Sequence, residues 1–176
     1  MRHDDCVKRV IIIGSGGAGK STLARDLGER LGLPVVHLDA HFWQAGWVES
    51  DKTDWLEWQR KALLEPRWIM DGNYGGTLDM RLTAADTVIF LDLPREVCVA
   101  RVVGRALRYR GRTRPDMAAD CPERLDLKFL RWIWHYPQHN RPAILEKLSR
   151  LEGKRVLRLQ SAGAVKRLTD ELTRLP

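Results

Sequence analysis

Residues Val10–Ser21 read VIIIGSGGAGKS, and this stretch decides the fold. Its first four residues form a β-branched apolar run, which is typical of a buried strand. Gly14–Ser21 matches the pattern G-x-x-x-x-G-K-[ST] of a phosphate-binding loop. Leucines then recur every four residues across 23–31, which indicates a helix with one apolar face. A strand, a glycine-rich loop and a helix in this order predict a site for the phosphates of a nucleotide.

The chemistry of such a loop gives each residue type a task. Glycines adopt positive φ and let phosphate oxygens approach backbone N–H groups at the positive end of the following helix. Lys20 supplies a mobile charge for the β and γ phosphates, and Ser21 offers a hydroxyl ligand to Mg²⁺. We therefore predict nucleotide binding by Gly14, Ser15, Gly16, Gly17, Ala18, Gly19, Lys20, Ser21 and Thr22.

Length and composition favour one compact domain over residues 1–176, with a lid segment at about 105–124. No apolar run approaches the roughly 18 residues of a membrane span, and the charged stretch Met1–Asp5 does not resemble a secretion signal. The 3 cysteines are scattered, which fits free thiols in a reducing compartment. We expect a cytoplasmic protein without a membrane partner, and the sequence leaves its oligomeric state open.

The rest of the chain alternates predicted strands and helices. Five strands separated by helices predict an α/β fold, with a parallel sheet covered on both faces. The expected strands are 9–13, 35–38, 68–70, 87–91 and 155–159. The expected helices are 20–31, 54–64, 94–109, 122–134, 142–151 and 162–172.

Three of these strands are followed by an aspartate: Asp39, Asp71 and Asp92. Ligands of such folds bind at the carboxyl ends of the strands, where a carboxylate beside a phosphate loop can hold Mg²⁺. We predict that Asp71 and Ser21 hold the metal and that Asp39 contacts the acceptor as its catalytic base. A helix cap or turn is the alternative for each aspartate, and for Asp92 we favour it.

The net charge of +7 is concentrated in the arginine-rich stretch 101–131. Such charge suits either a nucleic acid or a small polyphosphate, and arginine forks bind phosphate oxygens in pairs. Arg101 and Arg105 lie on one face of a predicted helix, and Arg112 follows in the lid. We predict that the first two are catalytic, closing over the transferred group, and that all three bind nucleotide. A merely solvated basic face is the alternative.

The order of these motifs resembles the nucleoside monophosphate kinase-like group of P-loop proteins, which includes adenylate and shikimate kinases. Nearly the full chain is also similar to bacterial adenylate kinase-related proteins labelled topology modulation proteins. The motifs that carry the second resemblance are HLD at 37–39, DGNY at 71–74, YRGRTR at 109–114 and CPER at 121–124.

The resemblance implies a three-layer sandwich whose five parallel strands have the order 2-3-1-4-5, with an arginine-rich helical lid. It implies ATP as phosphoryl donor with Mg²⁺, and it places Arg101 and Arg105 on the ATP side. Asn73-Tyr74 stands where adenylate kinases have Phe-Pro-Arg, so AMP is not indicated as the acceptor. We expect a small-molecule or nucleotide acceptor beside Asp39, Asp71, Gly72, Asn73 and Arg81, with Arg81 a candidate for an acidic group of that acceptor.

A second hypothesis is a nucleotide-gated regulatory ATPase that affects DNA topology or engages a protein or DNA partner. The positive charge favours it. The sequence has no recognisable DNA-reading motif, and its arginines gather beside the phosphate site, so nucleic acid is the less favoured partner.

Overall fold

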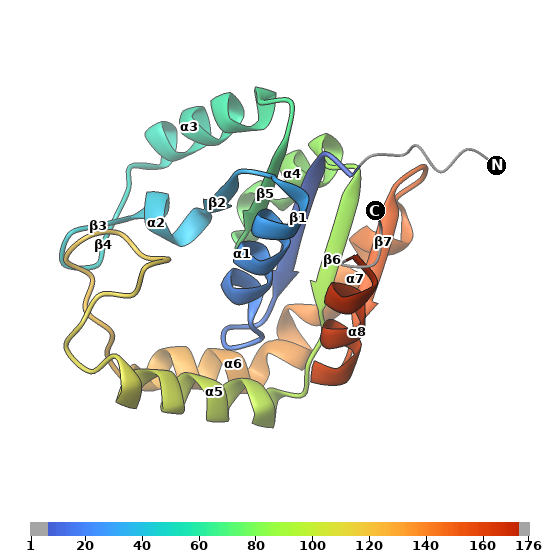
Figure 1. The fold of residues 1–176 in the computed structure, drawn as a ribbon. Helices are drawn as coiled ribbons and strands as arrows, with labels where there is room; N and C mark the ends of the chain where they lie inside the picture. Colours follow the sequence, from blue (N-terminus) through green and yellow to red (C-terminus); the bar gives the residue numbers. More distant parts are fainter. Residues whose placement is uncertain (1–6, 173–176) are drawn as a thin grey trace.

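The computed structural model describes residues 7–172, so the prediction made for Met1–Asp5 lies outside the described residues. Five parallel strands form one sheet in the order β2-β5-β1-β6-β7 (Figure 1). Their bounds are β1 Arg9–Gly14, β2 Val35–His37, β5 Trp68–Asp71, β6 Thr87–Leu91 and β7 Arg155–Leu159. Counted along the chain this is the order 2-3-1-4-5, and the predicted fold class is confirmed.

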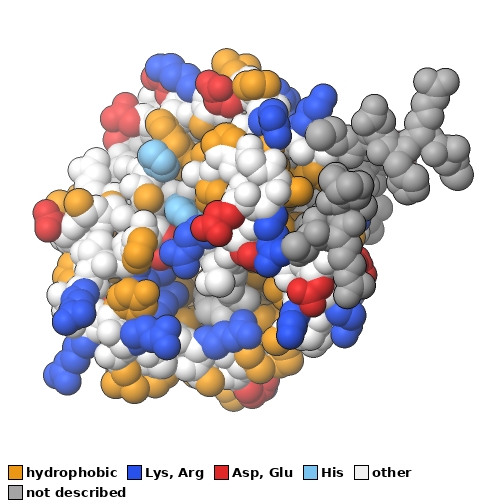
Figure 2. Space-filling view, in the orientation of Figure 1, with side chains coloured by type: hydrophobic (Ala, Val, Ile, Leu, Met, Phe, Trp, Pro, Cys, Tyr) orange, Lys and Arg blue, Asp and Glu red, His pale blue; other side chains and the backbone are white. Residues whose placement is uncertain are grey.

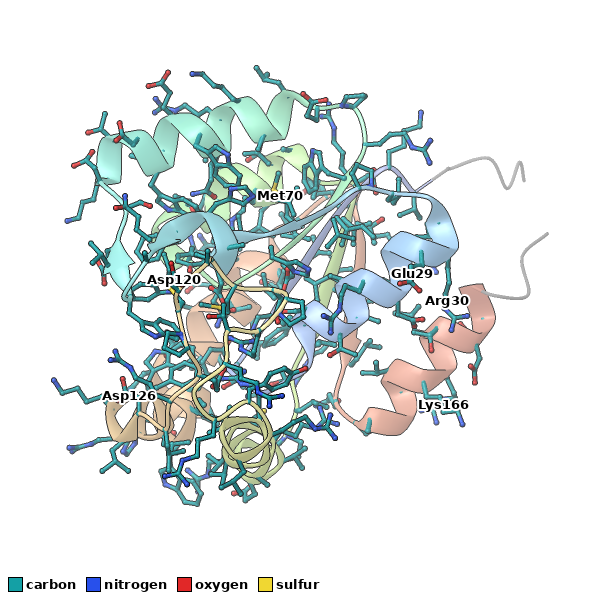
Figure 3. The ribbon with its side chains drawn as sticks, turned by 60° about the vertical axis from the view of Figure 1, so that its left-hand side comes forward. Glu29, Arg30, Met70, Asp120, Asp126 and Lys166 are labelled. Carbon is teal, nitrogen blue, oxygen red and sulfur yellow. The ribbon has the colours of Figure 1, made fainter. Side chains whose placement is uncertain are left out.

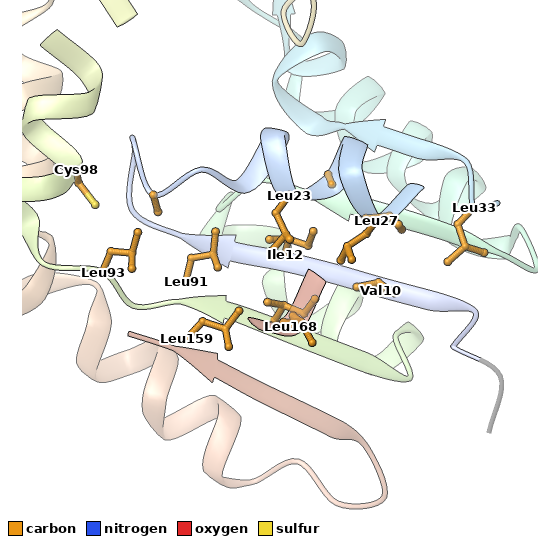
Figure 4. Close-up of a cluster of buried hydrophobic side chains, with 14 of the residues drawn as sticks. Val10, Ile12, Leu23, Leu27, Leu33, Leu91, Leu93, Cys98, Leu159 and Leu168 are labelled. Carbon is orange, nitrogen blue, oxygen red and sulfur yellow. The ribbon is translucent and has the colours of Figure 1, made fainter. Parts of the chain in front are cut away.

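The central strand β1 divides the core into two halves, because successive side chains of a strand point to opposite faces. Val10 and Ile12 belong to a cluster with α1 (Lys20–Leu31) and α8 (Ala162–Leu172) (Figure 4). Ile11 and Ile13 belong to a cluster on the other face, with side chains of α4 (Leu78–Ala84) and α7 (Arg141–Ser149). Both faces are therefore covered by helices, and the carboxyl edge of the sheet stays available for a ligand.

Two helices begin at aspartates that the sequence analysis did not assign as caps. The Asp126 carboxylate accepts hydrogen bonds from the backbone N–H groups of Lys128 and Phe129 at 2.7 and 3.3 Å. Helix α6 (Leu127–His139) therefore begins after Asp126, not at Pro122, and it continues through Pro137. Helix α3 (Lys52–Leu64) is capped in the same way by Asp51.

The segments around the sheet edge contain short elements that the sequence did not predict. They are α2 (Leu38–Phe42), a hairpin of β3 (Trp43–Gln44) and β4 (Val48–Glu49), and the 3₁₀ turn η1 (Gly75–Thr77). Helix α5 (Arg95–Arg108) ends close to its predicted end. The lid segment expected at about 105–124 begins in the last turn of α5 and continues over 109–126 as an irregular loop with two isolated bridges, without the helix that the resemblance implied. Residues 109–126 are called the lid segment below. Among residues 7–172, the helices are too short or too polar to cross a bilayer.

Candidate active site

The phosphate-binding loop has the backbone that its glycines permit. Gly14, Gly17 and Gly19 have φ of 148°, 77° and 98°, which side-chain-bearing residues rarely adopt. The Lys20 ammonium folds back over the loop and donates to the carbonyl oxygens of Gly14 and Ser15, both at 3.0 Å. Burial lowers the pKa of Lys20, while the charges of Asp39 and Asp71 act in the opposite direction.

Two glycines of the loop lie directly against the helices on either side of the lid segment. A side chain at Gly17 would collide with the Cys98 carbonyl of α5, and one at Gly16 would collide with the Phe129 ring of α6. The loop is therefore in close contact with both helices, and only glycine fits at these positions without moving them.

Asp71, at the end of β5, is held from two sides. The Ser21 hydroxyl donates to Oδ2 at 2.7 Å, and Nδ1 of His37 lies 2.5 Å from Oδ1. The Asp71 side chain is 4% exposed and that of His37 is 15% exposed. Although burial acts to lower it, the pKa of His37 is raised overall by the hydrogen bond and the charge of Asp71, with a contribution from Asp116. His37 was not among the predicted site residues, although its place at a strand end, two residues before Asp39, was a usable signal.

Asp39 lies in α2, at the same edge of the sheet. The Tyr74 hydroxyl donates to Asp39 Oδ1 at 2.6 Å, and burial together with the Asp39 charge raises the pKa of Tyr74. The surrounding rings form an aromatic cluster in which Phe42 and Trp55 both contact Tyr74. Trp58 stacks on Trp55 with ring centroids 5.4 Å apart, so the tryptophans of α3 pack against one another beside Tyr74.

The residues after β5 contact both Asp39 and the phosphate loop. Asn73 Oδ1 accepts a hydrogen bond from the backbone N–H of Gly14 at 3.0 Å. Gly72 has φ of 142°, and a β-carbon there would lie 2.9 Å from Leu38 Cβ. Both residues thus have structural contacts that set the shape of the edge.

Arg81 does not lie where an acceptor could reach it. Its side chain is fully buried, and its two terminal nitrogens donate to the carbonyl oxygens of Gly72, Asn73 and Tyr74 at 2.6–2.9 Å. Burial lowers its pKa to about 10. Arg81 therefore stabilises the backbone of residues 72–74 from within the core. The prediction that it contacts an acidic group of the acceptor is wrong, because its side chain is buried.

The three arginines predicted to bind nucleotide have different surroundings. Arg101 donates to the Ala18 carbonyl at 3.1 Å, so it lies against the phosphate loop. Arg105 pairs with Glu123 at 3.0 Å. Arg112 is exposed on the lid segment. Basic side chains gather over α5 along the lower part of the molecule in Figure 2. Of the three, Arg101 alone has a described hydrogen bond to the loop.

The lid segment brings buried acids into this basic region that were not among the predicted site residues. The Glu123 side chain is 4% exposed, and Arg114 pairs with both Glu123 and Asp116, at 2.5 and 2.8 Å. Burial alone would raise the pKa of Asp116, but the Arg114 charge and the Ser21 hydroxyl bring it below its ordinary value. Asp116, a residue of the lid segment, therefore lies beside Ser21 of the phosphate loop.

The lid segment also contacts the β3–β4 hairpin. Gly46 N–H donates to the Asp120 carbonyl at 2.9 Å, and Trp47 Nε1 donates to the Pro122 carbonyl at 3.1 Å. The Cys121 thiol donates to the Gln44 carbonyl at 3.2 Å and is buried. Asp120 is labelled on this part of the lid segment in Figure 3. These contacts join two segments far apart in the sequence.

Replacing Trp47 with phenylalanine is expected to speed alkylation of the Cys121 thiol by about 2- to 10-fold, because one hydrogen bond contributes about 0.5–1.5 kcal/mol. Mass spectrometry of labelled peptides would measure the Cys121 rate separately from those of the other cysteines. Trp134→Phe is the matched control, since Trp134 is an exposed tryptophan of α6. Equal rates in the two variants would show that the Trp47 contact does not hold the lid segment.

Asp92 has a structural role, but it pairs with two arginines instead of forming the helix cap or turn that we favoured. Its two carboxylate oxygens accept from Arg141 of α7 and Arg158 of β7, both at 2.8 Å, and its side chain is 7% exposed. Asp92 therefore fastens the last strand and α7 to the end of β6.

No protein-family model and no curated protein sequence matches this chain. Its structure is similar to shikimate kinase from Acinetobacter baumannii in complex with shikimate, with a TM-score of 0.59 and 17% identity over 96% of this chain and 92% of that chain. Shikimate kinase from Bacteroides thetaiotaomicron gives a TM-score of 0.54 and 16% identity over 96% and 98%. A Chloroflexus aurantiacus protein gives 0.52 and 16% over 94% and 97%. These similarities establish a kinase-like P-loop fold.

Proposed function

We propose that this protein is an ATP- and Mg²⁺-dependent phosphotransferase that transfers the γ-phosphoryl group to a small-molecule or nucleotide acceptor. The observation that carries the proposal is the convergence of Lys20, Ser21 and Asp71 where β1 and β5 end and α1 begins. A flexible cation, a hydroxyl and a carboxylate at a helix N-terminus suit a nucleotide polyphosphate and its metal.

The loop itself supports the phosphate assignment. Ser15 Oγ is buried and has no hydrogen-bond partner among the described residues. A buried hydroxyl without a partner costs free energy, and a phosphate oxygen would satisfy it. Lys20 can exchange its two carbonyl contacts for the β and γ phosphates, and Arg101 already lies beside the loop.

The chemistry of the donors fits Mg²⁺, because Ser21 and Asp71 offer only oxygens. Within residues 7–172, no three His, Cys, Asp or Glu side chains are grouped to hold a metal alone. That fits a cation which shares its coordination with phosphates and water. When bound, Mg²⁺ would neutralise charge on the β- and γ-phosphate oxygens.

On the acceptor side, we propose that Asp39 orients the acceptor and takes its proton, with Gly72 and Asn73 shaping the floor. Tyr74 keeps Asp39 in place through its hydroxyl. Arg105 contacts Glu123 through Nε and Nη2, and we propose that it turns toward a phosphate when nucleotide binds, as part of a rearranging lid in the single domain. The topology modulation grouping and cytoplasmic location stay predictions.

The test is ADP release from ATP and Mg²⁺ with a panel of nucleoside monophosphates, nucleosides and small hydroxy acids. We expect one acceptor to raise turnover toward the roughly 1–100 s⁻¹ that is common among kinases. Mass spectrometry of that acceptor should then show one added phosphoryl group. Slow turnover that no acceptor changes would instead support the regulatory ATPase.

A further inference from the structure

His37 owes its position to the pairing of two strands. In the parallel register of β2 and β5, His37 is the partner of Asp71. The backbone therefore places the imidazole beside the carboxylate, and Nδ1 lies 2.5 Å from Oδ1. The opposite oxygen, Oδ2, accepts from the Ser21 hydroxyl at 2.7 Å. Within the described residues, the hydrogen bonds to the Asp71 side chain come from these two groups.

A cation bound between Ser21 and Asp71 would replace the hydrogen bond of Ser21 to Oδ2 but not the contact of His37 with Oδ1. The χ2 torsion of an aspartate is broad, so hydrogen bonds rather than rotamer preference set the orientation of its carboxylate. A cation held by Ser21 and Asp71 would draw on the Ser21 oxygen and on Oδ2. The contact of His37 is on Oδ1, on the other side of the carboxylate, and would remain.

We infer that His37 is a positioning residue for the metal–nucleotide complex: it fixes the Asp71 carboxylate so that one oxygen faces Ser21. This inference rests on the proposed function. Groups that orient a metal-binding carboxylate typically change metal affinity by about 10- to 100-fold when they are removed. His37 itself makes no contact with the phosphate loop among the described hydrogen bonds, so its effect passes through Asp71.

A purely structural role for His37 makes a different prediction. If the imidazole only fastens the edge strand β2 to the sheet, its loss weakens nucleotide binding to the same degree with and without metal. If it positions Asp71, the loss appears only when Mg²⁺ is present. The ratio of the two affinities therefore separates the roles, and it requires no catalytic turnover.

The experiment measures ATP affinity by titration calorimetry, once with Mg²⁺ and once with a chelator, for the full-length protein and three variants. His37→Ala removes the contact. His37→Asn keeps an N–H donor near the position of Nδ1. His139→Ala is the matched control, because His139 is an exposed histidine at the end of α6. Thermal melting of each variant establishes that it is folded.

We expect His37→Ala to lose about 10- to 100-fold of the affinity gained with Mg²⁺ and to keep its metal-free affinity. His37→Asn should recover most of that gain, and His139→Ala should match the wild type. If His37→Ala does not fold, His37→Phe, which keeps a ring but has no N–H donor, takes its place with the same expected loss.

An unchanged Mg²⁺ gain in His37→Ala, or an equal loss under both conditions without rescue by asparagine, would overturn the inference. Wild-type protein that binds ATP without any gain from Mg²⁺ would overturn the inference while leaving nucleotide binding in place. Wild-type protein that binds no ATP would overturn the proposed function and the inference with it.

Discussion

The Lys20→Ala protein is expected to release ADP at least about 100-fold more slowly than the wild type, since removing one group that stabilises the transition state typically has an effect of this size. Lys20 is the cation that lies directly over the phosphate loop, with its ammonium on the Gly14 and Ser15 carbonyl oxygens. Without it, charge that develops on the transferred group has no mobile counter-charge at this position. Steady-state ADP release with saturating acceptor measures the effect.

Lys166→Ala is the control for this experiment. Lys166 lies on α8, and Figure 3 shows it well away from the lid segment. Its rate should match the wild type. Among residues 7–172 the hydrogen bonds of Lys20 go to its own loop, so Lys20→Ala should also unfold at nearly the wild-type temperature. A Lys20→Ala protein with undiminished, acceptor-dependent turnover would contradict the role given to this loop.

The Arg81→Ala protein is expected to lose at least about 3 kcal/mol of unfolding free energy, since each buried polar group left without a partner costs about 1–3 kcal/mol. The substitution removes donors from three carbonyl oxygens, of which that of Tyr74 keeps the Thr77 N–H, and it leaves a cavity where a fully buried side chain was. Urea unfolding followed by circular dichroism measures the loss.

Two other arginine variants serve as controls for the stability loss of Arg81→Ala. Arg150→Ala removes an exposed ion pair with Glu146, and such pairs contribute only about 0–1 kcal/mol. Arg81→Lys keeps the charge but cannot reach all three carbonyl oxygens, so an intermediate loss is expected. If Arg81→Ala were as stable as Arg150→Ala, Arg81 would not be what holds the 72–74 backbone.

The sequence alone predicted the parts of the fold that local patterns determine. The β-branched run of β1, the leucine repeat of α1 and the bounds of β6, β7 and α8 follow from periodicity and glycine placement. The alternation of strands and helices was enough to indicate the sheet, and the loop motif was enough to place the phosphate site.

The acceptor side could not be predicted in the same way, because its short elements depend on contacts between distant segments. The β3–β4 hairpin has two residues in each strand and lies against the lid segment, a contact that leaves no periodic signal. Pro122 suggested a helix start, but its carbonyl accepts from Trp47 and the chain turns into α6 only after Asp126. Arg81 was misjudged because its helix and its depth of burial were unknown.

The contacts of Gly16 and Gly17 have a consequence for how the molecule responds to ligands. These two positions touch α6 and α5, and the lid segment is the chain that runs between those helices. If a bound polyphosphate displaced the loop, both α5 and α6, which flank the lid segment, would have to move with it. If nucleotide binding shifts the lid segment, as proposed, a second ligand whose affinity depends on the lid position must change nucleotide affinity by the same factor by which nucleotide changes its own. Because Gly16 and Gly17 lie so close to these helices, we expect nucleotide affinity and the position of the lid segment to change together.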